Sequence, residues 1–332
     1  MTRAGKALLV AVAVLAAVPL PGPRVPGPRA AARPAGGFGG TAGVVPRSIG
    51  GRSLGARPAA RRAAGIVVVA AGDIACPPGS PATAAGCQQR ATARAVLAQH
   101  PRAVLLLGDN QYRDGALWRY RAAYARTWGR FLPRTYPTPG NHEYKTRGAA
   151  GYFRYFARRA AAPVRPWYSF RLGSWHLVAL NSNCRAVDCA AEAAWLRADL
   201  AAHPARCTLA FWHHPRFSSG SEGDTMAVGP FWNALYSAGA DLVLNGHDHD
   251  YERFAPQDPL GQPDPANGIR ELVVGTGGAP WLPFRGSAAN TQVRATATFG
   301  VLRLTLRPGG YAWRFVHAAG APLVDQGQAA CH

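Results

Sequence analysis

Short apolar runs that end in a glycine turn or in a polar or ionisable residue are the feature of this sequence that most constrains its fold. Six such runs follow one another along the chain: Ile66–Ala71, Ala103–Leu107, Trp175–Leu180, Thr208–Trp212, Asp241–Leu244 and Leu272–Val274. Three Ala-, Arg- and Leu-rich segments between them are predicted to be helical: Ala82–His100, Leu117–Phe131 and Ala190–His203. Short strands that alternate with helices predict an α/β fold with buried strands.

The residues that follow these runs are expected to meet in space. In open α/β sheets, ligands bind beside the carboxyl ends of the strands. Asp73 and Asp109 each follow such a run, as do His213 and His247. We therefore expect these four side chains to converge, although they are far apart in the sequence.

Five segments supply potential metal ligands: Gly72-Asp73-Ile74, Gly108-Asp109-Asn110-Gln111-Tyr112, Gly140-Asn141-His142-Glu143, His213-His214-Pro215 and Gly246-His247-Asp248-His249. Carboxylate, imidazole, amide and phenolate groups suit borderline or hard ions such as Fe, Mn and Zn. Glycines beside the ligands allow tight turns and close approach of the backbone. A pair of ions needs a bridging group, and a carboxylate has the two oxygens for it.

These five segments, in this order, resemble the motifs of the calcineurin-like metallophosphoesterase superfamily, over about residues 66 to 255. More narrowly, they look like those of purple acid phosphatases, because residues 246–253 read Gly-His-Asp-His-Asp-Tyr-Glu-Arg. The resemblance implies an α/β fold in which two mixed sheets form a β-sandwich flanked by helices. It also implies hydrolysis of phosphate esters at a pair of metal ions.

The resemblance implies two metal sites that share Asp109. One ion is expected on Asp73, Asp109, Tyr112 and His249, and the other on Asp109, Asn141, His213 and His247. Fe is expected at the Tyr112 site, with Fe, Zn or Mn at the second. His142 matches the family residue that contacts the substrate and protonates the leaving oxygen. His214 and Arg216 are further candidates for substrate contact.

Two departures from the wider superfamily favour the purple acid phosphatase reading. The first motif often carries a second ligand, a histidine, where this chain has Ala75, and Tyr112 can fill that vacancy. Many protein phosphatases have, at the position of Tyr112, an aspartate that orients the catalytic histidine. Its absence here argues against a Ser/Thr protein phosphatase. We also expect the neighbours Asn245, Asp248 and Asp250 to orient the ligand imidazoles.

The expected reaction is attack on a phosphate ester, phosphomonoesters above all, by a hydroxide that the cations activate. A phosphodiesterase or nucleotidase with the same metals stays open, because the motifs do not fix the walls of the pocket. A second alternative, from another class, is a secreted binding protein with a relic metal site.

The first 64 residues differ in character from the rest. Arg3 and Lys6 precede an apolar run from Ala7 to Leu20, which predicts a secretory signal peptide within residues 1–30. Residues 31–64 are rich in Pro, Gly and Arg and are expected to form a cationic linker that can retain the protein at a cell surface. The folded domain is expected over residues 65–332, with no further span and a secreted or extracytoplasmic location.

Charge and cysteines complete the sequence-based picture. The net charge is +20, and residues 1–64 supply half of it. Because no basic run is interleaved with aromatic residues, specific nucleic-acid binding is not predicted. Six cysteines suit an oxidising compartment. Cys76 and Cys87 are close in sequence, as are Cys184 and Cys189, which leaves Cys207 for Cys331, although many other pairings are open.

Overall fold

The computed structural model describes residues 65–332. The expected signal peptide, residues 1–30, and the expected linker, residues 31–64, lie outside the described residues. Among the described residues, no helix is both long and apolar enough to cross a membrane.

The first of two sheets has six strands in the order β13-β12-β11-β1-β2-β3. Its strands are β1 (Ile66–Ala71), β2 (Ala103–Leu107), β3 (Thr135–Thr138), β11 (Thr298–Arg307), β12 (Gly310–Gly320) and β13 (Gln326–Ala330). The pairs β1–β2 and β2–β3 are parallel, so the ends of these three strands point to the same edge. Strands β11 and β12 are antiparallel and form a hairpin.

The second sheet has seven strands in the order β10-β8-β9-β7-β6-β5-β4. Its strands are β4 (Tyr168–Leu172), β5 (Trp175–Ala179), β6 (Cys207–Phe211), β7 (Leu242–Asn245), β8 (Tyr251–Phe254), β9 (Arg270–Val274) and β10 (Thr291–Ala295). Its central strands β5, β6, β7 and β9 are parallel.

The two sheets share a buried core, and the central strands of the second sheet are buried on both faces. Leu209 of β6 belongs to a cluster that also contains Leu105 of β2, whereas the next residue, Ala210, packs with Leu196 and Phe231 of the helices. Successive side chains of a strand point to opposite faces. This burial on both faces explains why central strands such as β6 are continuous apolar runs with no polar face.

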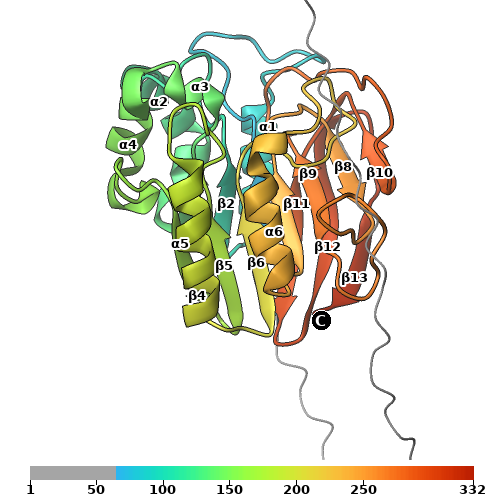
Figure 1. Ribbon diagram of the computed structural model, residues 1–332. Helices are drawn as coiled ribbons and strands as arrows, with labels where there is room; N and C mark the ends of the chain where they lie inside the picture. The colour runs from blue at the N-terminus through green and yellow to red at the C-terminus, as the bar shows by residue number, and fades with distance from the viewer. Residues whose placement is uncertain (1–64) are drawn as a thin grey trace, which may run out of the picture. The chain divides into compact units, whose positions relative to one another are not determined.

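Helices flank the sandwich, which confirms the expected arrangement. In Figure 1, α5 (Cys189–Ala202) and α6 (Gly229–Ser237) cover the face of the sheet that contains β5 and β6. Helix α1 (Gln89–Ala98) packs against β11 and β12 of the other sheet. The remaining helical segments are α2 (Leu117–Ala122), α3 (Asn141–Tyr144), α4 (Ala150–Phe156), and the short 3-10 helices Tyr124–Arg126, Trp128–Arg134, Arg147–Ala149, Ala157–Ala160 and Met226–Val228.

The prediction of one helix over Leu117–Phe131 was wrong, because this segment breaks into α2 and two short 3-10 helices. The backbone N–H of Tyr124 donates to the side-chain oxygen of Gln111 at 3.1 Å. That N–H group therefore makes no hydrogen bond within a helix, and the chain bends around the loop that follows β2.

The three disulfide bonds join the cysteines paired from the sequence, namely Cys76–Cys87, Cys184–Cys189 and Cys207–Cys331. The last bond ties the C-terminal end of the described chain to the start of β6. The disulfide at Cys87 also accounts for the late start of α1, at Gln89 and not at the predicted Ala82.

Candidate metal centre

The loops that follow the parallel strands of both sheets meet at one edge of the sandwich. The backbone N–H of Asp73, after β1, donates to Gly108 O, after β2, at 3.1 Å. The N–H of Gly246, after β7, donates to His213 O, after β6, at 3.0 Å. Gly72 N–H crosses between the sheets to Val274 O at 2.9 Å. These bonds bring the predicted ligand residues of both sheets to a common edge.

One group of candidate ligands gathers around Tyr112. Its hydroxyl donates to Asp73 Oδ1 at 2.8 Å and lies 2.9 Å from His249 Nε2. His249 Nε2 is in turn 3.4 Å from Asp73 Oδ1. Oxygen and nitrogen donors from three loops thus converge on one point.

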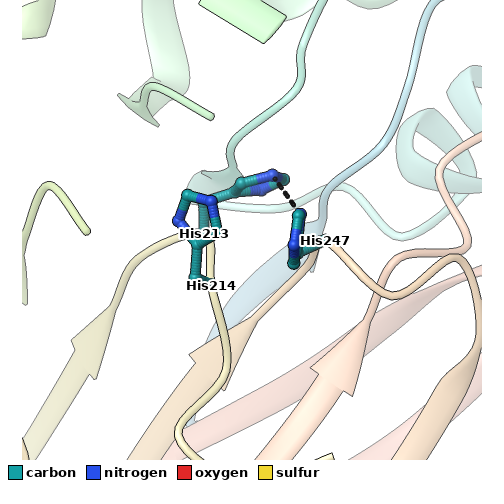
Figure 2. A group of neighbouring side chains, drawn as sticks. All are labelled: His213, His214 and His247. Carbon is teal, nitrogen blue, oxygen red and sulfur yellow. Dashed lines mark hydrogen bonds between the residues drawn. The ribbon is translucent and has the colours of Figure 1, made fainter. Parts of the chain in front are cut away.

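A second group gathers around His213. Its Nε2 lies 2.9 Å from Asn141 Oδ1 and 3.2 Å from His247 Nδ1. Figure 2 shows His213 and His247 turned toward each other, with the ring of His214 beside them. All three side chains come from the loops that follow β6 and β7.

Asp109 lies between the two groups. Asp73, Asp109 and His213 each place one ligand atom so that the three atoms lie within 4.8 Å of one another. The Asp109 carboxylate is 3.5 Å from His213 Nε2 and accepts the backbone N–H of His142 at 2.9 Å. A single carboxylate therefore faces both sets of donors, as a bridging ligand must.

The backbone of the site is held in a conformation that few residues adopt. Asp73, Asp109 and His247 have positive φ values of 59°, 46° and 74°. Non-glycine residues in this region are strained, and such strain concentrates at functional sites. A Cβ atom on Gly108 would lie 2.5 Å from His213 Nδ1, so a larger residue there would displace the imidazole.

Residues 66–251 match the Calcineurin-like phosphoesterase family. The chain belongs to this family. It is 30% identical to purple acid phosphatase 15 of Arabidopsis thaliana over 191 residues. The aligned region is 46% of this chain and 36% of that protein. It is 32% identical over 180 residues to a phosphoenolpyruvate phosphatase of Allium cepa, over 45% of this chain and 36% of that protein. The chain thus spans little more than a third of the length of either relative.

Solved structures share the fold of this phosphoesterase. A purple acid phosphatase from yellow lupin seeds matches with a TM-score of 0.61 and 17% identity, over 80% of this chain and 53% of that one. A dimetal phosphatase from Danio rerio matches with a TM-score of 0.54 and 13% identity, over 81% of this chain and 100% of that one. Two mixed sheets flanked by helices are therefore the fold of the family.

The charge balance of the candidate site fits bound cations. Asp73 and Asp109 are buried, and in residues 65–332 their ion-pair partners are histidines, with no lysine or arginine among them. Burial and the two carboxylates raise the pKa of Tyr112 well above 10. Clustered carboxylates and a phenol with no fixed cation are a donor set that metal ions would neutralise.

His213 offers a free nitrogen to a cation, and the ring of His249 is oriented by a similar hydrogen bond. Burial lowers the pKa of His213 to about 3, so its ring is neutral. Since a carbonyl only accepts, His213 Nδ1 donates to Leu107 O at 2.8 Å and Nε2 keeps its lone pair. His249 Nδ1 donates to Pro280 O at 2.5 Å in the same way. Burial alone would lower the pKa of His249, but the hydrogen bond and the charge of Asp73 raise it to about 9. A cation bound to Asp73 would offset that charge and lower the pKa of His249 again.

Asn245, Asp248 and Asp250 were expected to orient the ligand rings, but none of them bonds to a ring of His213, His247 or His249 in residues 65–332; the backbone carbonyls of Leu107 and Pro280 orient His213 and His249. Asp248 instead accepts Ser218 Oγ at 2.5 Å and the N–H of Glu222 at 2.8 Å, which fixes the loop after β6. Asn245 donates to Trp212 O at 3.2 Å.

Of the three predicted substrate contacts, His142 and His214 lie at the centre and Arg216 lies apart from it. His142 Nε2 is 3.8 Å from Asp109 Oδ2. The ring centroid of His214 is 4.3 Å from that of His247, and its Nδ1 is bonded to Ser182 Oγ at 2.7 Å. The Arg216 guanidinium is buried over the Phe217 ring and donates to Pro259 O, and no bond joins it to a candidate ligand in the described residues.

Glu143 has a role that the sequence did not reveal. It stands in the third motif, yet its buried carboxylate accepts backbone N–H groups and no metal-ligand candidate bonds to it. Oε1 accepts from Asn110 at 3.0 Å and Oε2 from Gly140 at 2.7 Å. A glutamate three residues after a helix N-cap is a known capping pattern, and this signal could have identified it.

Proposed function

We propose that this phosphoesterase hydrolyses phosphate esters, with phosphomonoesters as its main substrates. The observation that carries the proposal is the position of Asp109 between Asp73 and His213. Two ions about 3.5–4 Å apart catalyse phosphoryl transfer in many enzymes, and a carboxylate between two sets of donors has the two oxygens to be shared by such a pair. Seven donors of the family pattern gather here, which disfavours a binding protein with a relic site.

In this proposal, Asp73, Asp109, Tyr112 and His249 hold one ion, and Asp109, Asn141, His213 and His247 hold the other. We propose Fe at the Tyr112 site, since a phenolate oxygen suits a hard ferric ion, and Fe, Zn or Mn at the second. When bound, the two cations supply Lewis acidity toward the phosphoryl oxygens and promote the ionisation of water.

His142 carries out the proton transfer that the leaving group needs. Its Nδ1 donates to Arg113 O at 2.7 Å, so Nε2 is the nitrogen turned toward Asp109. In this tautomer Nε2 keeps its lone pair; once it is protonated, that proton can pass to the departing alkoxide oxygen, a step that contributes about 10²–10⁴-fold. The ring of His214 is fixed by the bond of its Nδ1 to Ser182 and lies beside that of His247, which leaves Nε2 for contact with the phosphoryl group.

A comparison of two nitrophenyl esters tests the proposal. The purified protein is assayed with the phosphate monoester and the corresponding diester over a range of metal loads. We expect metal-dependent hydrolysis with a higher kcat/KM for the monoester. Faster turnover of the diester would favour the phosphodiesterase alternative, and no turnover with any metal would favour a binding protein.

We further propose that the protein is exported and acts outside the cytoplasm. Three disulfide bonds within the fold suit an oxidising compartment. The signal peptide and the cationic linker expected in residues 1–64 supply the route and a means of surface retention. Deleting residues 31–64 should release the protein from the cell surface without loss of phosphatase activity.

A further inference from the structure

Lys145 is the only lysine between residues 65 and 332, and it lies at the metal centre. Apart from histidines, every other basic residue of this range is an arginine. The side chain follows helix α3, which begins with the candidate ligand Asn141 and carries His142 in its first turn. A residue type that the fold uses once is thus placed one helical turn from the group that faces the leaving oxygen.

The Lys145 ammonium points at the imidazole of His142. Its Nζ lies 2.8 Å from Nε2 and 3.1 Å from Nδ1. Because Nδ1 already donates to Arg113 O, Nε2 is the nitrogen that accepts from the ammonium. That nitrogen is also the one nearest to Asp109. Lys145 therefore brings a positive charge to the substrate side of the centre.

No carboxylate neutralises this charge among the described residues. The ion pairs of residues 65–332 leave Lys145 out, and the nearby Asp114 is paired with Arg119 at 3.0 Å. The side chain is also exposed, so an incoming anion can reach it. An exposed ammonium with an imidazole as its partner can turn to a stronger acceptor when one arrives.

We propose that Lys145 binds a phosphoryl oxygen that is free in a monoester and esterified in a diester, and so makes the centre selective for monoesters. This inference rests on the proposed hydrolysis of phosphate esters. In this proposal, two oxygens of a bound phosphoryl group would face the metal ligands, and the others would face His142 and Lys145. A monoester offers a charged oxygen there, whereas a diester offers a neutral ester oxygen that carries a bulky group.

Arg216, a predicted substrate contact, is buried over Phe217 and away from the centre. Lys145 supplies the positive charge for the substrate in its place. An ammonium is a compact point charge with three donors, and its flexible stem can follow the phosphoryl group during reaction. A hydrogen bond between two charged groups is about twice as strong as one between neutral groups. We therefore assign the discrimination between ester classes to Lys145, and the proton transfer to His142.

The test compares Lys145→Met with Lys145→Arg and with a matched control, Arg154→Met, which removes an exposed charge from α4. We expect Lys145→Met to lower kcat/KM for the monoester by about 10- to 100-fold, as loss of a charged hydrogen bond does. Its kcat/KM for the diester should stay close to the wild-type value. Lys145→Arg should recover most of the monoester activity, and Arg154→Met should match the wild type.

Calorimetric binding of inorganic phosphate to the metal-loaded proteins gives a readout that does not depend on turnover. Lys145→Met should bind phosphate about 10-fold more weakly, and Arg154→Met as the wild type does. Equal losses for monoester and diester, or unchanged phosphate affinity, would overturn the role of Lys145. If the wild type hydrolyses neither ester, the proposed function fails, and the calorimetry still decides whether Lys145 contacts phosphate.

Discussion

The carboxylate of Glu143 accepts a hydrogen bond from the backbone N–H of Asn110 at 3.0 Å, although the two residues follow different strands of the sheet. The same carboxylate also accepts the N–H of Gln111 at 3.2 Å, the hydroxyl of Tyr120 at 2.9 Å and the N–H of Gly140 at 2.7 Å. One buried side chain thus fixes the loop of Asp109 and Tyr112 against the loop of Asn141.

Replacing Glu143 by alanine should therefore loosen both loops. Three backbone N–H groups would lose their acceptor in a buried place, at about 1–3 kcal/mol for each. We expect the free energy of unfolding in urea to fall by about 3–5 kcal/mol and metal affinity to fall about 10- to 100-fold. Glu143→Gln, which keeps the size and one acceptor oxygen, should lose less of both. An alanine variant as stable as the wild type would contradict this role.

Tyr112→Phe tests the proposed ferric site. A tyrosinate bound to ferric iron absorbs visible light, and phenylalanine has no oxygen to bind. We expect the wild-type protein purified with iron to be coloured and the variant to be colourless at equal protein concentration. Tyr136→Phe, on β3 and stacked on Phe170, should leave the absorption spectrum unchanged. Persistence of the visible band in Tyr112→Phe would exclude this tyrosine as the ligand.

His176 should make the stability of the fold depend on pH. This residue is buried in β5, and burial lowers its pKa below 6.5 against the opposing effect of Asp199. Below pH 6.5 the unfolded chain takes up a proton at His176 that the folded chain resists. The free energy of unfolding therefore decreases as the pH is lowered, in total by about 1.4 kcal/mol for each unit that separates the pKa of His176 in the folded chain from that in the unfolded chain.

Thermal unfolding at pH 7 and pH 5 checks this pH dependence. His176→Gln keeps a donor for Asp199 but does not titrate, so its loss of stability on acidification should be smaller than that of the wild type. The exposed His100→Gln variant should behave as the wild type does. Equal pH dependence in all three proteins would show that His176 contributes nothing to it.

The disulfide Cys207–Cys331 should stabilise the fold more than Cys184–Cys189 does. The first closes a separation of 124 residues and the second a separation of 5. Loop entropy gives about 5 and about 2 kcal/mol for the two, respectively. Unfolding in denaturant of the double serine variants of each pair measures the difference. A larger loss for the shorter loop would mean that local packing, and not loop closure, dominates.

Much of the candidate site could be predicted from sequence because its residues are tied to strand ends. Asp73, Asp109, His213 and His247 each follow a continuous apolar run, and a parallel sheet brings such ends to one edge. The disulfide pairs were equally accessible, since two of them are local.

What could not be predicted depends on contacts between distant segments. The break after α2 arises from a bond between Tyr124 and Gln111, and the histidine rings are oriented by the carbonyls of Leu107 and Pro280. Arg216 carries a charge and stands near the His-His-Pro motif, but its orientation depends on the packing of Phe217 and Pro259. No local pattern encodes any of these choices.

Metal analysis of the wild type and of Asp109→Asn tests the central claim most directly, because in the proposed centre the two ions share this one carboxylate. Asparagine keeps the shape of the side chain but lacks the charge and the second anionic oxygen. We predict about two metal ions for each wild-type chain, and about one or none in the variant, together with loss of monoester hydrolysis. An Asp109→Asn protein that keeps two ions and wild-type turnover would contradict the account.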